Sequence, residues 1–487
     1  MIPYRGFVFV AGGLGFALMR FMRQTIARLR LVPAIVALFS AFPAFAAVDA
    51  TVDVTQAGVV GNGTVLNTAA IQKAIDDLSA KGGGTIRFPA GRYLSGTIEI
   101  KSKVTLHLDE DAILLGSTNP DDYKNLDPFM AGDGVPQGHA FLVARDADHV
   151  GIEGPGTIDG QGPALRAKQN PYKVRPFLIR FLRCTNVTVK DAHLTNPGAW
   201  TLNFFQTKTA TLEGLTIRTR STGLSNNDGI NIDSSEDFRI KNCDVNSGDD
   251  ALVIKSTSRD KPCRGIVASD CKLSTSTNAI KLGTESIGGF ADISVSHCQV
   301  SNVGMAGIAV YAVDGGDLKN VTISDITMDR VAMPIAVRLG ARLKTFREGE
   351  KARAAPGSLA DVTIKNVSAK NIRTIGILIS GVPSHPIQNL TLDGITLELP
   401  GGGTAQNAQV QLAERETAYP EYSMFGNTFP VHTIYARHVD KLTLNNIQTS
   451  LAKPDARPAT LFLDVENLNP KDFAPKPLPA TAPATQP

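Results

Sequence analysis

The sequence predicts an all-β chain wound into a right-handed parallel β-helix. Three observations support this fold class: a short apolar motif recurs nine times, most copies lie 27 or 28 residues apart, and a second strand can be aligned in each unit. A unit of a few short strands cannot bury its own inner face, so it must stack on its neighbours. With 487 residues, the chain is long enough for a large core of this kind.

The recurring motif has the form apolar-x-apolar-x-x-apolar, with Asn, Asp or Gly usual at its fifth place. Those residues tolerate a left-handed backbone and suit the end of a strand. Copies span residues 187–192, 210–215, 238–243, 266–271, 293–298, 321–326, 362–367, 390–395 and 442–447. Two longer gaps between copies predict inserted loops near residues 340–360 and 400–435.

The second strand of each unit forms a column along the coil. Its copies begin at Trp200, Asp228, Asp250, Asn278, Ala306, Met333 and Ile375. Neighbouring rungs of a sheet lie about 4.8 Å apart, so Asp228 and Asp250 are expected on adjacent rungs. The strand ends form a parallel column of Phe205, Asp233, Lys255, Gly283, Tyr311, Arg338 and Ser380. A polar, charged and aromatic stripe of this kind suits an extended polysaccharide.

The N-terminus is typical of an export signal rather than of a folded element. Arginines precede the apolar run Leu31–Phe42, and the small residues Ala44 and Ala46 suit a signal peptidase. The signal is predicted over residues 1–46, with Met22 as the true start. Its apolar run is too short for a stable membrane span, although a tandem anchor is the alternative. We therefore expect a secreted or periplasmic protein.

The remaining chain is predicted to form one β-helix domain, residues 47–468, and a disordered tail, residues 469–487, rich in Pro and Ala. An amphipathic helix around residues 67–80 would cap the N-terminal opening of the coil. Five of the 49 basic residues lie in the signal, which leaves 44 against 46 acidic ones. This balance gives no reason to expect nucleic acid as a partner. A covered coil is self-sufficient, which favours a monomer.

The five cysteines predict no metal cluster, because their spacings are not those of metal ligands. Cys243, Cys271 and Cys298 share the inward-facing last place of three consecutive motifs, which favours a ladder of small buried side chains. A disulfide between adjacent rungs, or one that uses Cys263, is the alternative in an oxidising compartment. No histidine has a partner at a recognisable spacing. We expect neither a metal nor a cofactor.

Three carboxylates stand out: Asp228, Asp249 and Asp250. Each lies beside Gly or Asn and just before a short apolar run, so a turn role is one interpretation. However, no other unit carries acids in this column, and here two rungs carry three. Like charges at such a distance are costly and raise the pKa of one member. A glycosidase uses such a cluster, whereas a structural protein has no reason to build it.

These motifs resemble those of polygalacturonases, glycoside hydrolase family 28, over roughly residues 50–465. Residues 226–229, Asn-Asn-Asp-Gly, resemble the Asn-Thr-Asp motif of the family. Residues 248–250, Gly-Asp-Asp, resemble its Gly-Asp-Asp motif, and residues 196–200 resemble its tryptophan segment. The resemblance implies a right-handed parallel β-helix that hydrolyses glycosidic bonds with inversion. By motif, Asp249 would protonate the leaving oxygen, while Asp228 and Asp250 would position and deprotonate water.

The candidate substrate contacts, from the resemblance and from the strand columns, are Asn226, Lys255, Trp200, Lys281, Glu285, Tyr311 and Arg338. Endo-acting members have Gly-His-Gly where this chain has Gly-Thr284-Glu, a form that resembles exo-acting and bacterial members. Endo-acting members also carry Arg-Ile-Lys, which reads uronate carboxylates, where residues 307–311 carry neither charge. Arg338, one coil further, is a candidate replacement; a loop-facing arginine without that role is the equal alternative.

The leading hypothesis is an exported hydrolase of galacturonic-acid-containing pectic chains that acts from a chain end. The two inserted loops could wall off the groove, which would favour exo action, or they could be surface insertions with no role. A polysaccharide lyase on the same scaffold is the second class, since three acids could bind calcium. A non-catalytic carbohydrate-binding β-helix is the third, although it gains nothing from a repelling aspartate cluster.

Overall fold

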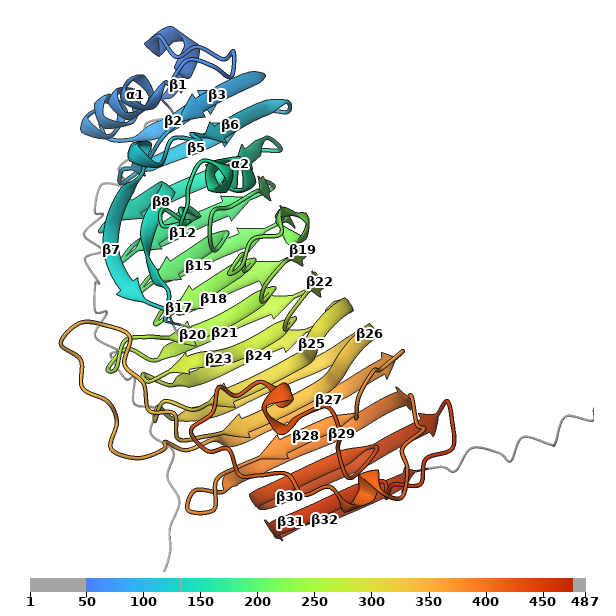
Figure 1. Ribbon diagram of the computed structural model, residues 1–487. Helices are drawn as coiled ribbons and strands as arrows, with labels where there is room; N and C mark the ends of the chain where they lie inside the picture. The colour runs from blue at the N-terminus through green and yellow to red at the C-terminus, as the bar shows by residue number, and fades with distance from the viewer. Residues whose placement is uncertain (1–49, 132–133, 476–487) are drawn as a thin grey trace, which may run out of the picture. The chain divides into compact units, whose positions relative to one another are not determined.

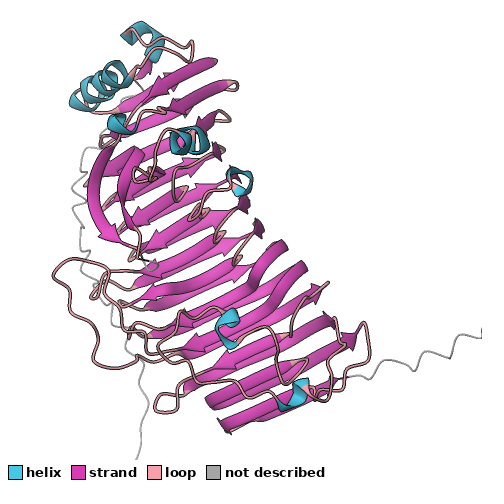
Figure 2. Ribbon diagram, in the orientation of Figure 1, coloured by secondary structure: helices cyan, strands magenta, loops and turns pink. Residues whose placement is uncertain are grey.

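The computed structural model describes residues 50–131 and 134–475 (Figure 1). The predicted export signal lies outside the described residues. Strands dominate the described chain, and the longest loops lie beside its C-terminal half (Figure 2). Its described strands pair in parallel, except that β7 (Lys124–Met130) runs antiparallel to β8. The predicted parallel β-helix is confirmed.

The parallel pairings follow three runs along the coil. The first run, called the acid-bearing sheet below, joins β4 (Ile98–Ile100), β8 (Pro136–Arg145), β11 (Phe177–Leu182), β14 (Leu202–Phe205), β17 (Ile230–Asp233), β20 (Leu252–Ser256), β23 (Ile280–Ser286), β25 (Gln299–Ala312), β26 (Leu318–Leu339), β28 (Ile377–Ser380), β30 (Ile434–Leu451) and β31 (Thr460–Glu466). The longest of these strands, such as β26, bend from one run into the next.

The other two runs complete each coil. The second joins β1 (Thr51–Asp53), β2 (Gly84–Phe88), β5 (Val104–Leu108), β9 (Asp148–Glu153), β12 (Thr185–Lys190), β15 (Lys208–Glu213), β18 (Glu236–Lys241), β21 (Cys263–Ser269), β24 (Phe290–Ser296), β26, β27 (Ala360–Lys370), β29 (Ile387–Leu399), β30 and β32 (Asn469–Pro475). The third joins β3 (Gly91–Ser95), β6 (Ala112–Gly116), β10 (Thr157–Asp159), β13 (His193–Thr195), β16 (Thr216–Arg218), β19 (Asp244–Ser247), β22 (Lys272–Thr275) and β25.

The nine motif copies stack in the predicted register. Val187 pairs with Ala210, Ala210 with Phe238, and Phe238 with Ile266. The fifth place of every copy has a left-handed backbone, with φ between 50° and 66° at Asp191, Gly214, Asn242, Asp270, His297, Asp325, Asn366, Gly394 and Asn446. The asparagines and His297 at this place therefore have the structural turn role that their residue types predict.

Apolar side chains from all three runs fill the interior of the coil. Phe181 stacks on Phe204 with ring centroids 5.0 Å apart, and Phe204 meets Phe238 edge-on at the same distance. All five described cysteines are buried and free, so Cys243 and Cys271 belong to the core ladder and not to a disulfide.

Helix α1 (Thr68–Ala80) lies where the apolar periodicity predicts it and contacts β2, β4 and β5. Its buried residues are Ile71, Ala74, Ile75 and Leu78. Its place beside the first strands (Figure 1) agrees with a capping role, which stays a prediction. The second helix, α2 (Gly162–Ala167), is short. Within the described ranges, no helix has the length and apolar character that a membrane crossing requires.

The short 3-10 turns all lie between strands. They are η1 (Val54–Ala57), η2 (Pro120–Asp122), η3 (Arg220–Thr222), η4 (Asn407–Gln409) and η5 (Tyr422–Phe425). At the C-terminal end the structure departs from the predicted disordered tail, because β32 (Asn469–Pro475) pairs with β30. The edge of the last coil offers unpaired backbone groups, and this segment satisfies them despite its prolines. Residues 476–487 lie outside the described chain.

Candidate active site

The three aspartates lie together at the start of two neighbouring strands of the acid-bearing sheet. Asp228 precedes β17, and Asp249 and Asp250 both precede β20, which begins at Leu252. The backbone N–H of Gly229 donates to the carbonyl oxygen of Asp250 at 2.8 Å and joins the two rungs. Because both Asp249 and Asp250 lie in the bend, strand alternation does not send them to opposite faces.

Donors from the next rung surround Asp250, which is 4% exposed. Its Oδ1 accepts from the Thr277 hydroxyl at 3.0 Å, and from the side-chain amide of Asn278 at 2.9 Å. Its Oδ2 lies 3.0 Å from Nζ of Lys281. Burial alone would raise the pKa of Asp250, but Lys281, Lys255 and these hydrogen bonds outweigh burial and lower it. Asp250 is therefore ionised at neutral pH.

The pKa of Asp249 is shifted in the opposite direction, upward. The Thr277 hydroxyl lies 3.0 Å from its Oδ1, the same distance as from Oδ1 of Asp250, so one hydroxyl links the two carboxyl groups. Burial and the charge of Asp250 raise the pKa of Asp249, and the nearby lysines offset this only in part. A carboxyl group with a raised pKa, Asp249, beside one with a lowered pKa, Asp250, is the arrangement that acid–base catalysis needs.

Lys255 lies near the end of β20, and its ammonium group contacts the aspartate cluster. Its Nζ lies 3.3 Å from Oδ2 of Asp228 and 3.7 Å from Oε2 of Glu285. The same Nζ lies 3.8 Å from the ring centroid of Trp200, which adds a cation–π contact. Burial lowers the pKa of Lys255, but the nearby carboxyl groups of Glu285 and Asp228 raise it by more. The net shift of the pKa is upward, so this side chain is a cation.

Asp228 is 3% exposed. Burial raises its pKa well above the ordinary value, and the charges of Asp249 and Asp250 raise it further, while Lys255 pulls in the other direction. The three aspartates thus differ: Asp250 carries the charge most readily, and Asp228 and Asp249 hold protons to higher pH. Their environments separate them although their residue type is the same.

Asn226 is held by Arg175, a residue that the sequence patterns did not identify. Nη2 of Arg175 donates to Oδ1 of Asn226 at 2.9 Å and to the carbonyl oxygen of Ser225 at 2.7 Å. The guanidinium carbon lies 5.7 Å from the ring centroid of Tyr172. Asn226 has a left-handed backbone with φ of 56°, which asparagine tolerates better than most residues. Its amide is therefore oriented before any substrate binds.

Two further site residues come from the inserted segment 400–433. Oε1 of Glu421 lies 2.9 Å from Nζ of Lys281 and accepts from Nδ2 of Asn278 at 3.0 Å. Glu421 thus shares both donors with Asp250. Tyr419 lines the pocket and is 44% exposed. The interruption of the repeat predicted that this segment is an inserted loop. No sequence pattern within the segment identified Glu421 or Tyr419 as site residues.

Two predicted substrate contacts are placed elsewhere. Tyr311 is 1% exposed and lies under the inserted segment, with its hydroxyl 3.5 Å from Oε2 of Glu421. Arg338 is buried, and its Nη2 donates to the carbonyl oxygens of Glu414 at 3.1 Å and Arg415 at 2.9 Å. Of the two predicted roles of Arg338, the structure agrees with the loop-facing one, because its guanidinium anchors the inserted segment and does not line the pocket of the acids.

Two segments cover the outer face of the acid-bearing sheet on either side of the acids. Toward the N-terminal coils, β7 packs Phe129 against Phe177, Trp200 and Phe205. Toward the C-terminal coils, segment 400–433 covers a second apolar cluster (Figure 1), which contains Ala306, Ala309, Tyr311, Met333, Ala336, Ile375, Leu378, Phe429, Val431 and Tyr435. The acids therefore lie in a pocket between two covered stretches of sheet.

That pocket unites seven of the ten predicted site residues. Its lining consists of Ala131, Trp200, Asn226, Asp228, Asp249, Asp250, Lys255, Glu285 and Tyr419. Over the described ranges, no group of three or more His, Cys, Asp or Glu side chains is arranged to hold a metal ion. The ammonium groups of Lys255 and Lys281 already lie between the carboxylates, where a cation would have to bind.

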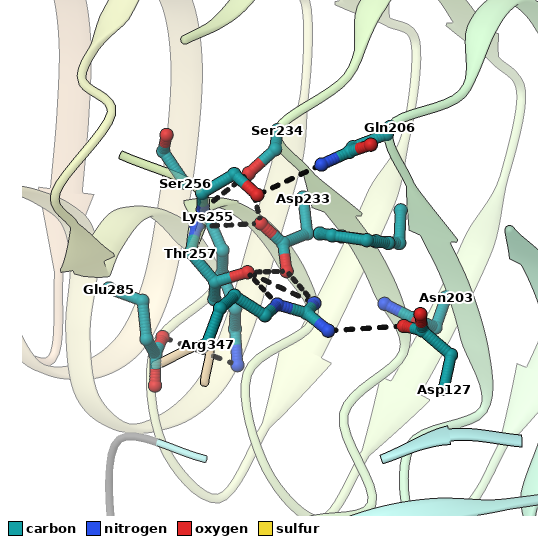
Figure 3. Close-up of polar contacts among 12 residues, drawn as sticks. Asp127, Asn203, Gln206, Asp233, Ser234, Lys255, Ser256, Thr257, Glu285 and Arg347 are labelled. Carbon is teal, nitrogen blue, oxygen red and sulfur yellow. Dashed lines mark hydrogen bonds and ion pairs between the residues drawn. The ribbon is translucent and has the colours of Figure 1, made fainter. Parts of the chain in front are cut away.

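Arg347, on the loop after β26, ties the N-terminal cover to the sheet (Figure 3). Its Nη1 lies 3.1 Å from Oδ2 of Asp127 on β7, and its Nη2 donates to the Thr257 hydroxyl at 3.1 Å. Its guanidinium carbon lies 3.6 Å from the ring centroid of Phe205. Asp233 adds a second carboxylate, 3.6 Å from Nη2. One side chain thus joins three segments that are distant in the sequence.

The family model described as "Glycosyl hydrolases family 28" matches residues 82–418. The chain belongs to this family. A second model, described as "Rhamnogalacturonase A/epimerase, pectate lyase-like", matches residues 51–110. Membership of glycosyl hydrolase family 28 makes the chain a glycoside hydrolase, which sets aside the lyase and the non-catalytic binding protein.

Relatives of this family 28 chain span most of its length. A probable polygalacturonase of Vitis vinifera is 27% identical over 363 residues, 70% of this chain and 73% of that protein. An endo-polygalacturonase of Pectobacterium carotovorum is 28% identical over 329 residues, 62% of this chain and 77% of that protein. The solved structure of an exopolygalacturonase from Thermotoga maritima has a TM-score of 0.64 at 19% identity, covering 82% of this chain and 92% of its own. This solved structure supports the right-handed parallel β-helix as the fold of the chain.

Proposed function

We propose that this family 28 enzyme hydrolyses α-glycosidic bonds in galacturonic-acid-containing pectic chains and removes units from a chain end. The polygalacturonase relatives support the substrate class. The observation that carries chain-end action is the pocket itself, which lies between an apolar cover under β7 and a second cover under segment 400–433. An enzyme that cuts internal bonds needs sheet open on both sides of its acids.

The pKa directions support a role for each aspartate. Asp249 holds a proton and gives it to the glycosidic oxygen as the bond to the leaving sugar breaks. Asp250 is ionised and takes a proton from the attacking water, while Asp228 holds that water in place. Lys255 balances the negative charge beneath the reacting sugar. Attack by water opposite the leaving group inverts the anomeric carbon, as the family resemblance implies.

A panel of defined galacturonate oligosaccharides tests the proposed function. We expect galacturonate as the first and only small product from every chain length, and proton NMR should show the β-anomer first, because water attacks the face opposite an α-linked leaving group. Intermediate oligomers at early times would contradict chain-end action, and the α-anomer would contradict inversion. Unsaturated products that absorb ultraviolet light would contradict hydrolysis. Detection of the enzyme in culture medium or periplasm tests the proposed export.

Arg347→Met tests whether the N-terminal cover confines the substrate. The change removes the contacts to Asp127 and Thr257 but keeps an apolar side chain over Phe205, so we expect a stability loss of about 1–2 kcal/mol and the appearance of oligogalacturonates among the products. Product sizing by chromatography measures the effect. The matched control is Arg264→Met, which removes an exposed arginine paired with Glu236 on another face. Release of monomer alone by Arg347→Met would show that the cover does not depend on this contact.

A further inference from the structure

A polymer bound at the acids must leave the pocket across one edge of the acid-bearing sheet, because the sheet is covered on both sides along the coil. At the edge where the strands end, the loop that carries Arg347 lies against Thr257. At the edge where the strands begin, the pocket is lined by Asn226 and Asp249, which both lie in turns. The strand-start edge is therefore the exit for the rest of the chain.

A second surface pocket lies on this same edge. It is formed around Val303 and Gly304 of β25, and Val303 pairs with Thr275 of β22, on the rung that carries Thr277. The backbone N–H of Met305 donates to the carbonyl oxygen of Thr277 at 2.9 Å, and the Thr277 hydroxyl contacts Asp249 and Asp250. The rung of Thr277 thus lies between the second pocket and the rung of Asp249 and Asp250, so two rung steps, about 9.6 Å, separate them along the coil.

Three exposed arginines line this second pocket, called the arginine edge below: Arg220, Arg330 and Arg373. The other lining residues are Asn302, Val303, Gly304 and Asn371, so none of the described lining residues is acidic. An arginine has five N–H donors on a planar group that matches the geometry of a carboxylate.

Backbone carbonyls engage only part of these guanidinium groups. Nη1 of Arg220 donates to the carbonyl oxygen of Asn302 at 2.9 Å. Nη2 of Arg373 donates to the carbonyl oxygens of Val303 at 2.9 Å and Gly304 at 3.1 Å. Arg330 pairs with a carboxylate outside the lining, because its Nη1 lies 2.7 Å from Oδ2 of Asp329. Neutral carbonyls orient Arg220 and Arg373 without cancelling their charge.

We propose that the arginine edge binds carboxylates of the polyuronate chain that extends out of the catalytic pocket. This inference rests on the proposed chain-end hydrolysis of pectic chains. The position decides the occupant: a chain that passes Asp249 and leaves at the strand-start edge meets Arg220, Arg330 and Arg373 before it reaches solvent. The charge agrees, since a polyuronate presents a carboxylate on each unit and arginine binds carboxylates through paired N–H donors.

The double variant Arg220→Gln with Arg373→Gln tests this inference against substrates of two lengths. With long polygalacturonate we expect kcat/KM to fall about three- to ten-fold, chiefly through KM, as befits two exposed ion pairs. With an aryl α-galacturonide, which has one sugar unit and no carboxylate beyond the pocket, kcat/KM should stay within about two-fold. Added salt should weaken the wild type on the long substrate more than the variant, because screening acts on the contacts that the variant lacks.

Matched variants separate this effect from general changes. Arg239→Gln with Arg264→Gln removes two exposed arginines from β18 and β21, and it should leave both substrates unaffected. Arg373→Lys keeps the charge and should retain most of the activity on the long substrate. Equal losses on both substrates, or no loss on polygalacturonate, would overturn the arginine edge. Failure of the wild type to hydrolyse trigalacturonate would instead overturn the proposed function.

Discussion

Asp249→Asn is expected to lower kcat on galacturonate oligosaccharides by about 10²- to 10⁴-fold, because the amide cannot give a proton to the leaving oxygen. The same change should leave the protein as stable as the wild type at pH 7, or more stable. Burial and the charge of Asp250 raise the pKa of Asp249, so its ionised form costs stability as pH rises above the ordinary aspartate range. Steady-state kinetics and thermal unfolding at pH 7 measure the two effects.

The control for this variant is Asp270→Asn, which changes an exposed aspartate in a repeat turn with the same left-handed backbone that asparagine adopts. It should alter neither kcat nor the melting temperature. A substrate whose leaving group needs no proton should regain much of its rate with Asp249→Asn. Equal losses on both kinds of substrate would contradict the acid role of Asp249 and point to a binding role.

Lys281→Met is expected to lower the free energy of unfolding by about 3–5 kcal/mol at pH 7, because it removes the buried cation between Asp250 and Glu421. The wild-type pKa of Asp250 is lowered, so its stabilising contribution is present above the unfolded-state pKa near 3.9 and is lost as pH falls through the folded value. Without Lys281, burial opposes the ionisation of Asp250. Denaturant unfolding at pH 7 and pH 4 measures the difference.

The loss should therefore be larger at pH 7 than at pH 4, where protonation of Asp250 relieves its uncompensated charge. Lys272→Met is the matched control, since this lysine is exposed on β22, and its stability should match the wild type at both pH values. An equal loss at both pH values for Lys281→Met would mean that packing, and not charge, is what Lys281 contributes. The expected loss of activity follows from the same change, because the removal of Lys281 raises the pKa of Asp250 and makes its ionised form less favourable.

Local patterns were enough to predict the coil and its acid rungs. The motif period, the left-handed fifth places and the strand column together placed Asp228 and Asp250 on neighbouring rungs, as the bond from Gly229 confirms. A period predicts stacking because each coil repeats the same short path. The alignment of strands placed Lys255 next to Asp233 in the strand-end column, and the structure adds the contact of its Nζ with Oδ2 of Asp228 at 3.3 Å.

The same patterns failed where a residue outside the repeat decides the contacts. Arg338 has the right column position for a carboxylate reader, yet segment 400–433 passes over it and takes up its donors. Strand alternation likewise predicts opposite faces for Asp249 and Asp250. Both residues line the same pocket because they lie in the bend before β20. Column position predicts which face a side chain occupies, and says nothing of what covers that face.

The sequence by itself determined a parallel β-helix with three aspartates on two adjacent rungs, because the repeat period and the order of residues within each unit are local properties. The tertiary structure alone decided that the rungs lie in a pocket. Glu421 reaches Asn278 from 143 residues away, and Arg347 reaches Asp127 from 220 residues away. Inserted segments have no period, so their paths depend on the apolar surface they bury and the charges they meet.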